Sequence, residues 1–138
     1  MILLDTNVLS AVMAVEPPPK VLAWLDAQPT EALHLSTITL AEIGFGLSLL
    51  APGRRRRDLE ARFEAFVQEG FAHRVLSFDL EAARHCGPIM GHRRETGRPV
   101  SALDGQIAAI ARAHGLAVAT RNVRDFADCG VEVVNPFE

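Results

Sequence analysis

The sequence of 138 residues contains only two cysteines, Cys86 and Cys129, and neither belongs to a CxxC pair. We therefore expect no disulfide framework and no cysteine-based metal site, and we interpret both as small buried or half-buried thiols. No apolar run approaches the ~20 residues of a membrane-spanning helix, and no charged segment precedes an apolar stretch at the N-terminus. These absences predict a soluble, cytoplasmic protein without a membrane segment.

Lysine is almost missing as well, because Lys20 is the only one among 14 basic residues. The net charge of −3 argues against simple electrostatic wrapping of a nucleic acid. Arginine nevertheless suits bidentate recognition of phosphate or carboxylate better than lysine does. The arginines cluster at Arg54–Arg57, at Arg93, Arg94 and Arg98, and at Arg121 and Arg124. A solvated helix face remains the simpler interpretation of residues 54–57.

Hydrophobic residues form 49% of the chain, which is enough for a substantial core. The length fits one domain over residues 1–138. Apolar runs typical of strands alternate with segments of helical periodicity, so we expect a five-stranded parallel sheet covered by helices on both faces. The expected strands are 2–5, 33–36, 74–78, 116–120 and 131–135. The expected helices are about 8–14, 21–28, 39–50, 54–69, 80–95 and 101–114, the last ending at Gly115.

Four acidic residues follow the expected strands or begin the helices after them. Asp5 ends the first strand, and Glu42 lies in the helix after the second. Asp104 lies in the first turn of the helix that begins at Ser101, and Asp125 follows the fourth strand. Because ligands of parallel α/β sheets bind beyond the carboxyl ends of the strands, these side chains could share one site.

Helix capping is an alternative explanation for each acid taken alone. Ser101–Asp104 and Thr39–Glu42 have the spacing of a capping box, and Asn122–Asp125 and Asp5 could also cap helices. Capping does not explain why Asp5 ends an apolar strand. It also does not explain why Glu42 lies in a largely apolar helix.

Electrostatics favours a cation among these acids. Two carboxylates ~5 Å apart repel each other by about 3 kcal/mol at an effective dielectric constant near 20. Oxygen ligands suit Mg²⁺ or Mn²⁺, and the five histidines show no ligand spacing. Polar residues accompany the acids at Thr6, Asn7, Thr120 and Asn122. This pattern indicates metal-assisted hydrolysis at a phosphate.

Four segments resemble PIN-domain proteins of the VapC toxin type, and most closely their FitB-like branch. They are LLDTNVL, LSTITLAEIGFGL, GRPVSALDGQIAAIA and ATRNVRDF. The resemblance implies a three-layer α/β/α PIN-like fold with a five-stranded parallel sheet. It also implies a Mg²⁺-dependent ribonuclease that acts as the toxin of a type II toxin–antitoxin system.

The resemblance assigns roles to the acidic and polar residues. Asp5 and Asp104 correspond to direct metal ligands, and Glu42 and Asp125 would act through bound water. Supporting polar groups fall on Asn7, Thr120 and Asn122. Whether Asn122 or Asp125 supplies the fourth site residue stays open. Arginines at the mouth of the cleft, namely Arg98, Arg121 and Arg124, would guide the RNA backbone.

The implied partners are RNA, a VapB-like or FitA-like antitoxin, and DNA only through that antitoxin. Apolar residues at Leu47–Leu50 and 59–67 further predict a homodimer with a groove for the antitoxin tail. Two departures from the family pattern are Gly44 and Gly105, and we expect Gly105 to remove a side chain from the rim of the pocket. A metal-dependent phosphatase and a non-catalytic binding module are the alternatives, although Asn7 stands where a phosphatase D-x-D motif needs a second acid.

Overall fold

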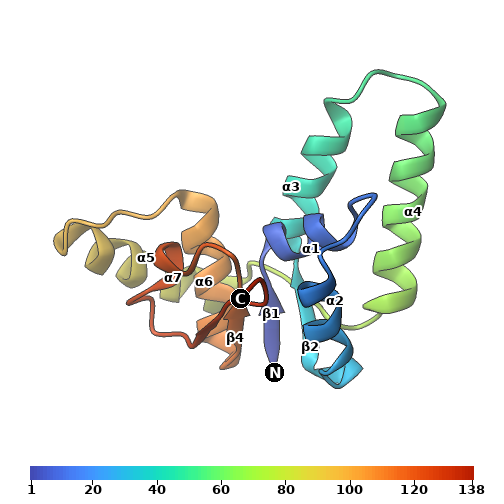
Figure 1. Cartoon of the computed structure of the whole chain (residues 1–138). Coiled ribbons are helices and arrows are strands. Elements are labelled where there is room, and N and C mark those ends of the chain that lie inside the picture. Colours follow the sequence, from blue (N-terminus) through green and yellow to red (C-terminus); the bar gives the residue numbers. More distant parts are fainter.

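The computed structural model describes all residues 1–138 and contains a five-stranded sheet (Figure 1). The strands lie in the order β3-β2-β1-β4-β5, and every neighbouring pair is parallel. The strands are β1 (Ile2–Leu4), β2 (Leu33–Ser36), β3 (Val75–Leu76), β4 (Ala117–Ala119) and β5 (Val133–Val134). The predicted α/β class and parallel sheet are confirmed.

Seven α-helices connect and cover the strands. They are α1 (Thr6–Val12), α2 (Pro19–Asp26), α3 (Thr37–Ser48), α4 (Arg54–Gly70), α5 (Leu80–Glu95), α6 (Ala102–His114) and α7 (Val123–Phe126), with a 3₁₀ turn at Thr30–Ala32. Both α1 and α3 begin two residues earlier than we expected, because Asp5 and Ser36 are the N-cap residues. Helix α7 was not among the expected helices, since four residues are too few to show a helical period, although Asn122 was considered as a possible N-cap.

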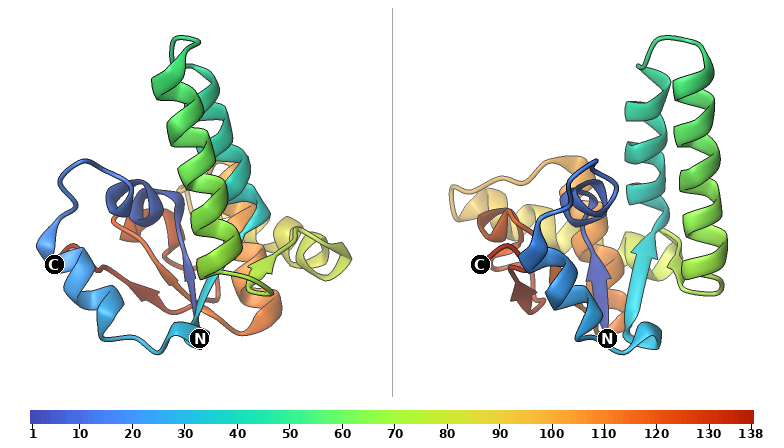
Figure 2. Two further views of the ribbon diagram at one scale, coloured as in Figure 1. Left: turned by 90° about the vertical axis from the view of Figure 1, so that its right-hand side faces the viewer. Right: turned by 45° about the vertical axis from the view of Figure 1, so that its right-hand side comes forward.

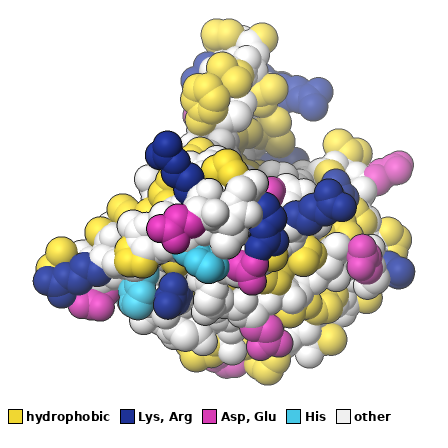
Figure 3. All heavy atoms as spheres, turned by 90° about the vertical axis from the view of Figure 1, so that its left-hand side faces the viewer, with side chains coloured by type: hydrophobic (Ala, Val, Ile, Leu, Met, Phe, Trp, Pro, Cys, Tyr) yellow, Lys and Arg dark blue, Asp and Glu magenta, His cyan; other side chains and the backbone are white.

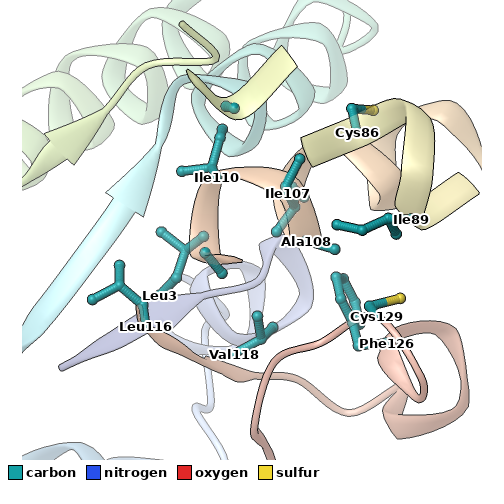
Figure 4. Close-up of a cluster of buried hydrophobic side chains, with 13 residues drawn as sticks. Leu3, Cys86, Ile89, Ile107, Ala108, Ile110, Leu116, Val118, Phe126 and Cys129 are labelled. Carbon is teal, nitrogen blue, oxygen red and sulfur yellow. The ribbon is translucent and has the colours of Figure 1, made fainter. Parts of the chain in front are cut away.

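Two hydrophobic clusters cover the opposite faces of the sheet. Successive side chains of a strand point to opposite faces, so Leu3 and Leu4 of β1 enter different clusters. The Leu3 cluster includes side chains of α5, α6 and α7 (Figure 4). The Leu4 cluster includes side chains of α1, α2 and α4. Cys86 and Cys129 are buried in the first cluster as free thiols. This arrangement is the predicted three-layer α/β/α fold.

Helices α3 and α4 form an antiparallel pair that projects from the sheet, which we call the helical arm (residues 37–70) (Figure 2). Its outer part exposes large apolar side chains, with Phe45 at 66% and Leu49 at 70% of full exposure. Among the four arginines that begin α4, Arg56 pairs with Glu60 and the other three are exposed, which favours the interpretation as a solvated face. No helix of the chain has the length and apolar character needed to span a bilayer.

Gly105 does not face the rim of a pocket, so that expectation was wrong. The residue is buried where α5 and α6 pack together, and a Cβ atom built on it would lie 2.8 Å from Cγ of Met90. The glycine therefore permits the close approach of α5 to the first turn of α6. That turn also carries Asp104, so the close packing of α5 and α6 fixes the position of the Asp104 backbone.

Candidate active site

Asp5 is the most enclosed acid of the site, with 5% of its surface exposed. It follows β1 directly, and its backbone N–H donates to the carbonyl of Ala119 in β4. The order of the strands reverses between β1 and β4, and crevices for ligands form at such switch points of parallel sheets. The predicted position of Asp5 at the carboxyl edge of the sheet is confirmed.

Three neutral donors hold the Asp5 carboxylate. The backbone N–H of Thr6 donates to Oδ1 at 2.8 Å, which places Asp5 at the N-cap of α1. Oδ2 accepts from Oγ1 of Thr120 at 2.7 Å and from Nδ2 of Asn7 at 3.2 Å. Capping therefore explains one of the three bonds. The bond from Thr120 connects the start of α1 to the end of β4, and the bond from Asn7 lies within the first turn of α1.

Thr120 and Asn7 extend this network into the loop after β4. Oγ1 of Thr120 accepts from the backbone N–H of Asn122 at 3.0 Å, and Oδ1 of Asn7 accepts from the backbone N–H of Arg121 at 3.1 Å. Thr120 is fully buried. The two side chains thus support Asp5 and shape the loop at once. The side chain of Asn122 lies at the N-cap of α7 and makes no capping bond.

A chain of hydroxyl groups leads to Glu42. Oγ1 of Thr6 donates to Oε1 of Glu42 at 2.7 Å, so the 3.0 Å contact between Thr6 and Thr39 must use the proton of Thr39. Thr39 in turn accepts from the hydroxyl of Ser36 at 3.3 Å. The capping box proposed for Thr39–Glu42 was wrong, because Ser36 caps α3 and accepts from the backbone N–H of Thr39. Glu42 is instead oriented by Thr6.

Asp104 and Asp125 approach the site from α6 and α7. Ser101 caps α6 and accepts from the backbone N–H of Asp104 at 3.1 Å, as the sequence predicted. Burial raises the pKa of Asp104, and the carboxylates of Asp125 and Glu42 raise it further. Each acid in this set therefore lies within electrostatic reach of another.

The same repulsion acts on Asp5. Burial first, and then the charges of Asp104 and Glu42, raise the pKa of Asp5 from 3.8 to about 6, although hydrogen bonds from Thr120 and Thr6 oppose the rise. Such a rise means that the folded protein disfavours the charged form by roughly 3 kcal/mol. None of the four acids takes part in an ion pair; the three pairs of the structure are Arg56–Glu60, Arg84–Glu81 and Arg98–Asp128.

The donor set suits a hard divalent cation. No three His, Cys, Asp or Glu side chains lie close enough together to enclose a metal ion by themselves. Mg²⁺ does not require such a cage, since it is commonly held by one or two carboxylates and keeps several water molecules. Oxygen atoms that repel each other and lack a protein cation fit Mg²⁺ or Mn²⁺ better than Zn²⁺, which prefers His and Cys.

An open pocket of about 620 Å³ borders Asp5. Polar side chains of Asn7, Ser10, Glu16 and Asn122 contribute to its wall together with Arg121. Glu42, Asp104 and Asp125 do not line it. The pocket thus offers a polar surface next to one end of the acidic site.

The three arginines expected at the cleft differ in their surroundings. The guanidinium of Arg121 lies 4.0 Å from the ring centroid of Phe137 and borders the pocket. Arg98 forms an ion pair with Asp128, which occupies its charge. Arg124 is exposed on α7. Basic and acidic side chains are interspersed on the face shown in Figure 3, so no continuous basic surface forms there.

The residues that sequence reasoning missed are mainly hydroxyls. Ser36 and Thr39 orient Glu42 through Thr6, yet a serine or threonine after a strand usually signals a cap. Another missed residue is Arg93, which is buried and donates to the backbone carbonyl of Asp125. No local pattern reveals it, because two of its three carbonyl partners lie 32 and 34 residues away.

The fold and the carboxylate-lined edge define an α/β/α protein with an acidic site at the switch point of a parallel sheet. The family model described as PIN domain matches residues 2–131. The chain belongs to the PIN domain family.

Similar proteins cover the whole chain. It is 46% identical over 138 residues to VapC ribonuclease Y4jK of Sinorhizobium fredii, an alignment that covers 100% of this chain and 99% of the relative. It is 41% identical to Toxin FitB of Neisseria gonorrhoeae, with 99% of each chain covered. A solved structure of FitAB bound to an IR36 DNA fragment superposes with a TM-score of 0.94 at 40% identity, covering 100% of this chain and 96% of that one.

The raised pKa of Asp5 predicts how stability changes with pH when EDTA removes divalent ions. Because the folded carboxyl has the higher pKa, folding takes up a proton between about pH 6 and pH 4, and the free energy of unfolding should rise as pH falls through this interval. The gain should approach about 3 kcal/mol, and Asp5→Asn should lack it. Urea unfolding from pH 7.5 to 4 measures both, with exposed Asp26→Asn as control. Parallel pH profiles for wild type and Asp5→Asn would contradict the assignment.

Proposed function

We propose that this chain is a Mg²⁺-dependent endoribonuclease and the toxin of a type II toxin–antitoxin system. The main support is that four acids at the switch point repel one another while no protein cation pairs with them. The names of its relatives, a VapC ribonuclease and Toxin FitB, agree with this function. Mn²⁺ would suit the same oxygen donors.

The four carboxylates divide into two roles. Asp5 and Asp104 would hold the metal directly, and Glu42 and Asp125 would orient water around it. When bound, the metal supplies Lewis-acid stabilisation of the phosphate and lowers the pKa of a bound water. Glu42 is suited to accept the proton of the attacking water, because Thr6 already fixes one of its oxygens and leaves the other available.

The pocket next to Asp5 is suited to receive the RNA strand on one side of the scissile phosphate. Arg121 stands at its wall with its guanidinium stacked on Phe137, so little side-chain freedom is lost when it contacts a phosphate. Arg124 would contact the strand from α7. Phosphate contacts of this kind position a strand without reading its sequence.

The helical arm would supply the protein partners. A groove of about 300 Å³ between α1, α3 and α4 is lined by Met13, Leu47 and Leu59 and reaches Glu42. An apolar antitoxin tail that carries a cation would fit it, as expected for a VapB-like or FitA-like protein, and DNA would be bound through that antitoxin. The exposed apolar residues at the end of the arm would join two copies of the chain.

Substitution of the metal ligands tests the activity. Asp5→Asn and Asp104→Asn should each reduce RNA cleavage by more than the roughly 10–100-fold loss typical of supporting residues. In EDTA, Asp5→Asn should be as stable as wild type or more stable, since a repulsive charge is gone. Millimolar Mg²⁺ should raise the melting temperature of wild type and leave both variants almost unchanged.

These measurements separate the proposal from its alternatives. If Asp5 only capped α1, Asp5→Asn would cleave normally and melt like wild type in both conditions, because Asn is a good N-cap. A phosphatase would hydrolyse p-nitrophenyl phosphate in an Asp5-dependent manner, and we expect no such turnover. Asp26→Asn is the control for changing an exposed acid.

Removal of the Arg121 charge tests the path of the RNA. Arg121→Gln should weaken RNA binding by a similar factor for all sequences and reduce the slope of log affinity against log salt by about one. The Mg²⁺-induced rise in melting temperature should persist, because Arg121 is not a ligand. Arg84→Gln, which removes an exposed arginine paired with Glu81, is the control. An unchanged salt slope in Arg121→Gln would contradict the assignment.

The oligomeric state tests the arm. Light scattering at micromolar concentration should give twice the mass of the chain, and Leu49→Glu should give a monomer because it places a charge in an apolar contact. Leu80→Glu changes another exposed leucine, 66% exposed at the start of α5, and should remain dimeric. A wild type that is monomeric at this concentration would refute the dimer.

A further inference from the structure

Arg93 is a buried cation without an acidic partner. It lies in the last turn of α5 with 3% of its surface exposed, and it belongs to none of the three ion pairs. Burying an unpaired charge is costly unless its donors are well used. Its neighbour Arg94 is exposed and shows what an ordinary arginine does at this helix end. The burial of Arg93 therefore needs an explanation.

The guanidinium is bound to backbone carbonyls from two segments. Nε donates to the carbonyl of Arg98 at 2.7 Å. Nη1 donates to the carbonyls of Asp125 at 3.1 Å and Ala127 at 2.7 Å. The same Nη1 lies 3.7 Å from the sulfur of Cys129. One planar side chain thus joins the loop after α5 to the end of α7.

Each of these segments delivers one carboxylate to the acidic site. Arg98 stands shortly before Ser101, the N-cap of α6, and Asp104 lies in the first turn of that helix. Asp125 lies in α7, and Arg93 donates directly to the backbone carbonyl of Asp125. The separation of Asp104 and Asp125 therefore depends on how the two segments are joined.

Helix α7 has little means of holding itself in place. It has four residues, too few for a stable helix in isolation, and its N-cap Asn122 makes no capping bond. Phe126 and Cys129 anchor its apolar side near Ile89 and Ala108 (Figure 4). Arg93 is the polar anchor that complements this packing.

We infer that Arg93 is a positioning residue that sets the spacing between Asp104 and Asp125 and thereby the affinity of the site for a divalent cation. The inference rests on the proposed metal-dependent function. Lysine could not replace it, because a single ammonium group lacks the planar fork that reaches carbonyls of two segments. Arg93 touches neither metal nor RNA in this assignment; it acts through the backbone.

A Mn²⁺ titration of the full chain tests this role at a temperature where all variants are folded. The electron paramagnetic resonance signal of the free ion gives the concentration of unbound Mn²⁺ and hence the affinity. Arg93→Met should weaken Mn²⁺ binding roughly ten-fold, as supporting residues of metal sites do. Arg93→Lys should also weaken it, although it keeps the charge. Arg94→Met is the matched control and should bind like wild type. Melting curves check that each variant unfolds cooperatively.

A second background distinguishes positioning from simple stabilisation. In the Asp125→Asn background, the ten-fold loss of Mn²⁺ affinity caused by Arg93→Met should shrink to roughly three-fold or less. Both changes act through the spacing between Asp104 and Asp125, so their effects should not add. Equal effects in both backgrounds, or wild-type affinity in Arg93→Met or Arg93→Lys, would overturn the inference. If wild type itself bound no Mn²⁺, the proposed metal site would fail and this inference with it. If wild type bound Mn²⁺ and cleaved RNA while Arg93→Met bound equally, only the inference would fail.

Discussion

The burial of the Asp5 carboxylate is the constraint on which the rest of this structure depends. β1 is apolar on both faces and sits in the middle of the sheet, so its end lies deep between the helical layers. A charge at this point costs roughly 3 kcal/mol, because burial and the nearby charges of Asp104 and Glu42 outweigh the hydrogen bonds of its neutral partners. β1 and β4 are paired neighbours, but the chain leaves β1 toward α1 on one face of the sheet and leaves β4 toward α7 on the other. Connections that leave toward opposite faces form a crevice above the end of β1, where Asp5 lies.

Neutral donors, and no protein cations, meet this constraint. Asp5 accepts three hydrogen bonds from Thr6, Asn7 and Thr120. Glu42 receives its bond from Thr6, at the end of a relay of hydroxyls. Such donors orient the carboxylates and leave their negative charge intact, whereas a paired lysine or arginine would neutralise it. The relay also joins α1 to α3, so the orientation of Glu42 and the docking of the helical arm share one set of bonds.

The sequence predicted the framework well because its signals are local. Apolar runs marked the strands, and helix α5 was expected over the residues that it occupies, 80–95, between Asp79 and Gly97. The capped turn at Ser101 placed Asp104 correctly. The errors arose where a side chain contacts residues that are distant in the sequence. Thr39 matched a capping box, yet its hydroxyl is hydrogen-bonded to Thr6, 33 residues away in the sequence.

Gly105 and Arg93 are two further residues whose roles the local sequence did not predict. Gly105 resembled a weak point at the start of a helix, but its missing side chain makes room for Met90 of α5. Arg93 resembled a member of a basic cluster with Arg94 and Arg98, but it is buried against carbonyls. Packing between helices decides both cases, and no periodicity within one helix reports it.

Three arginines near the acidic site are bound to groups other than its four carboxylates. Arg93 is bound to carbonyls, Arg98 is paired with Asp128, and Arg121 is stacked on Phe137. These three guanidinium groups are thus engaged by groups other than the four carboxylates, whereas Arg124 is exposed on α7. An arginine paired with one of these carboxylates would reduce the repulsion that favours a divalent cation. The same partners that hold these arginines away keep one of them, Arg121, at the wall of the pocket where a phosphate would arrive.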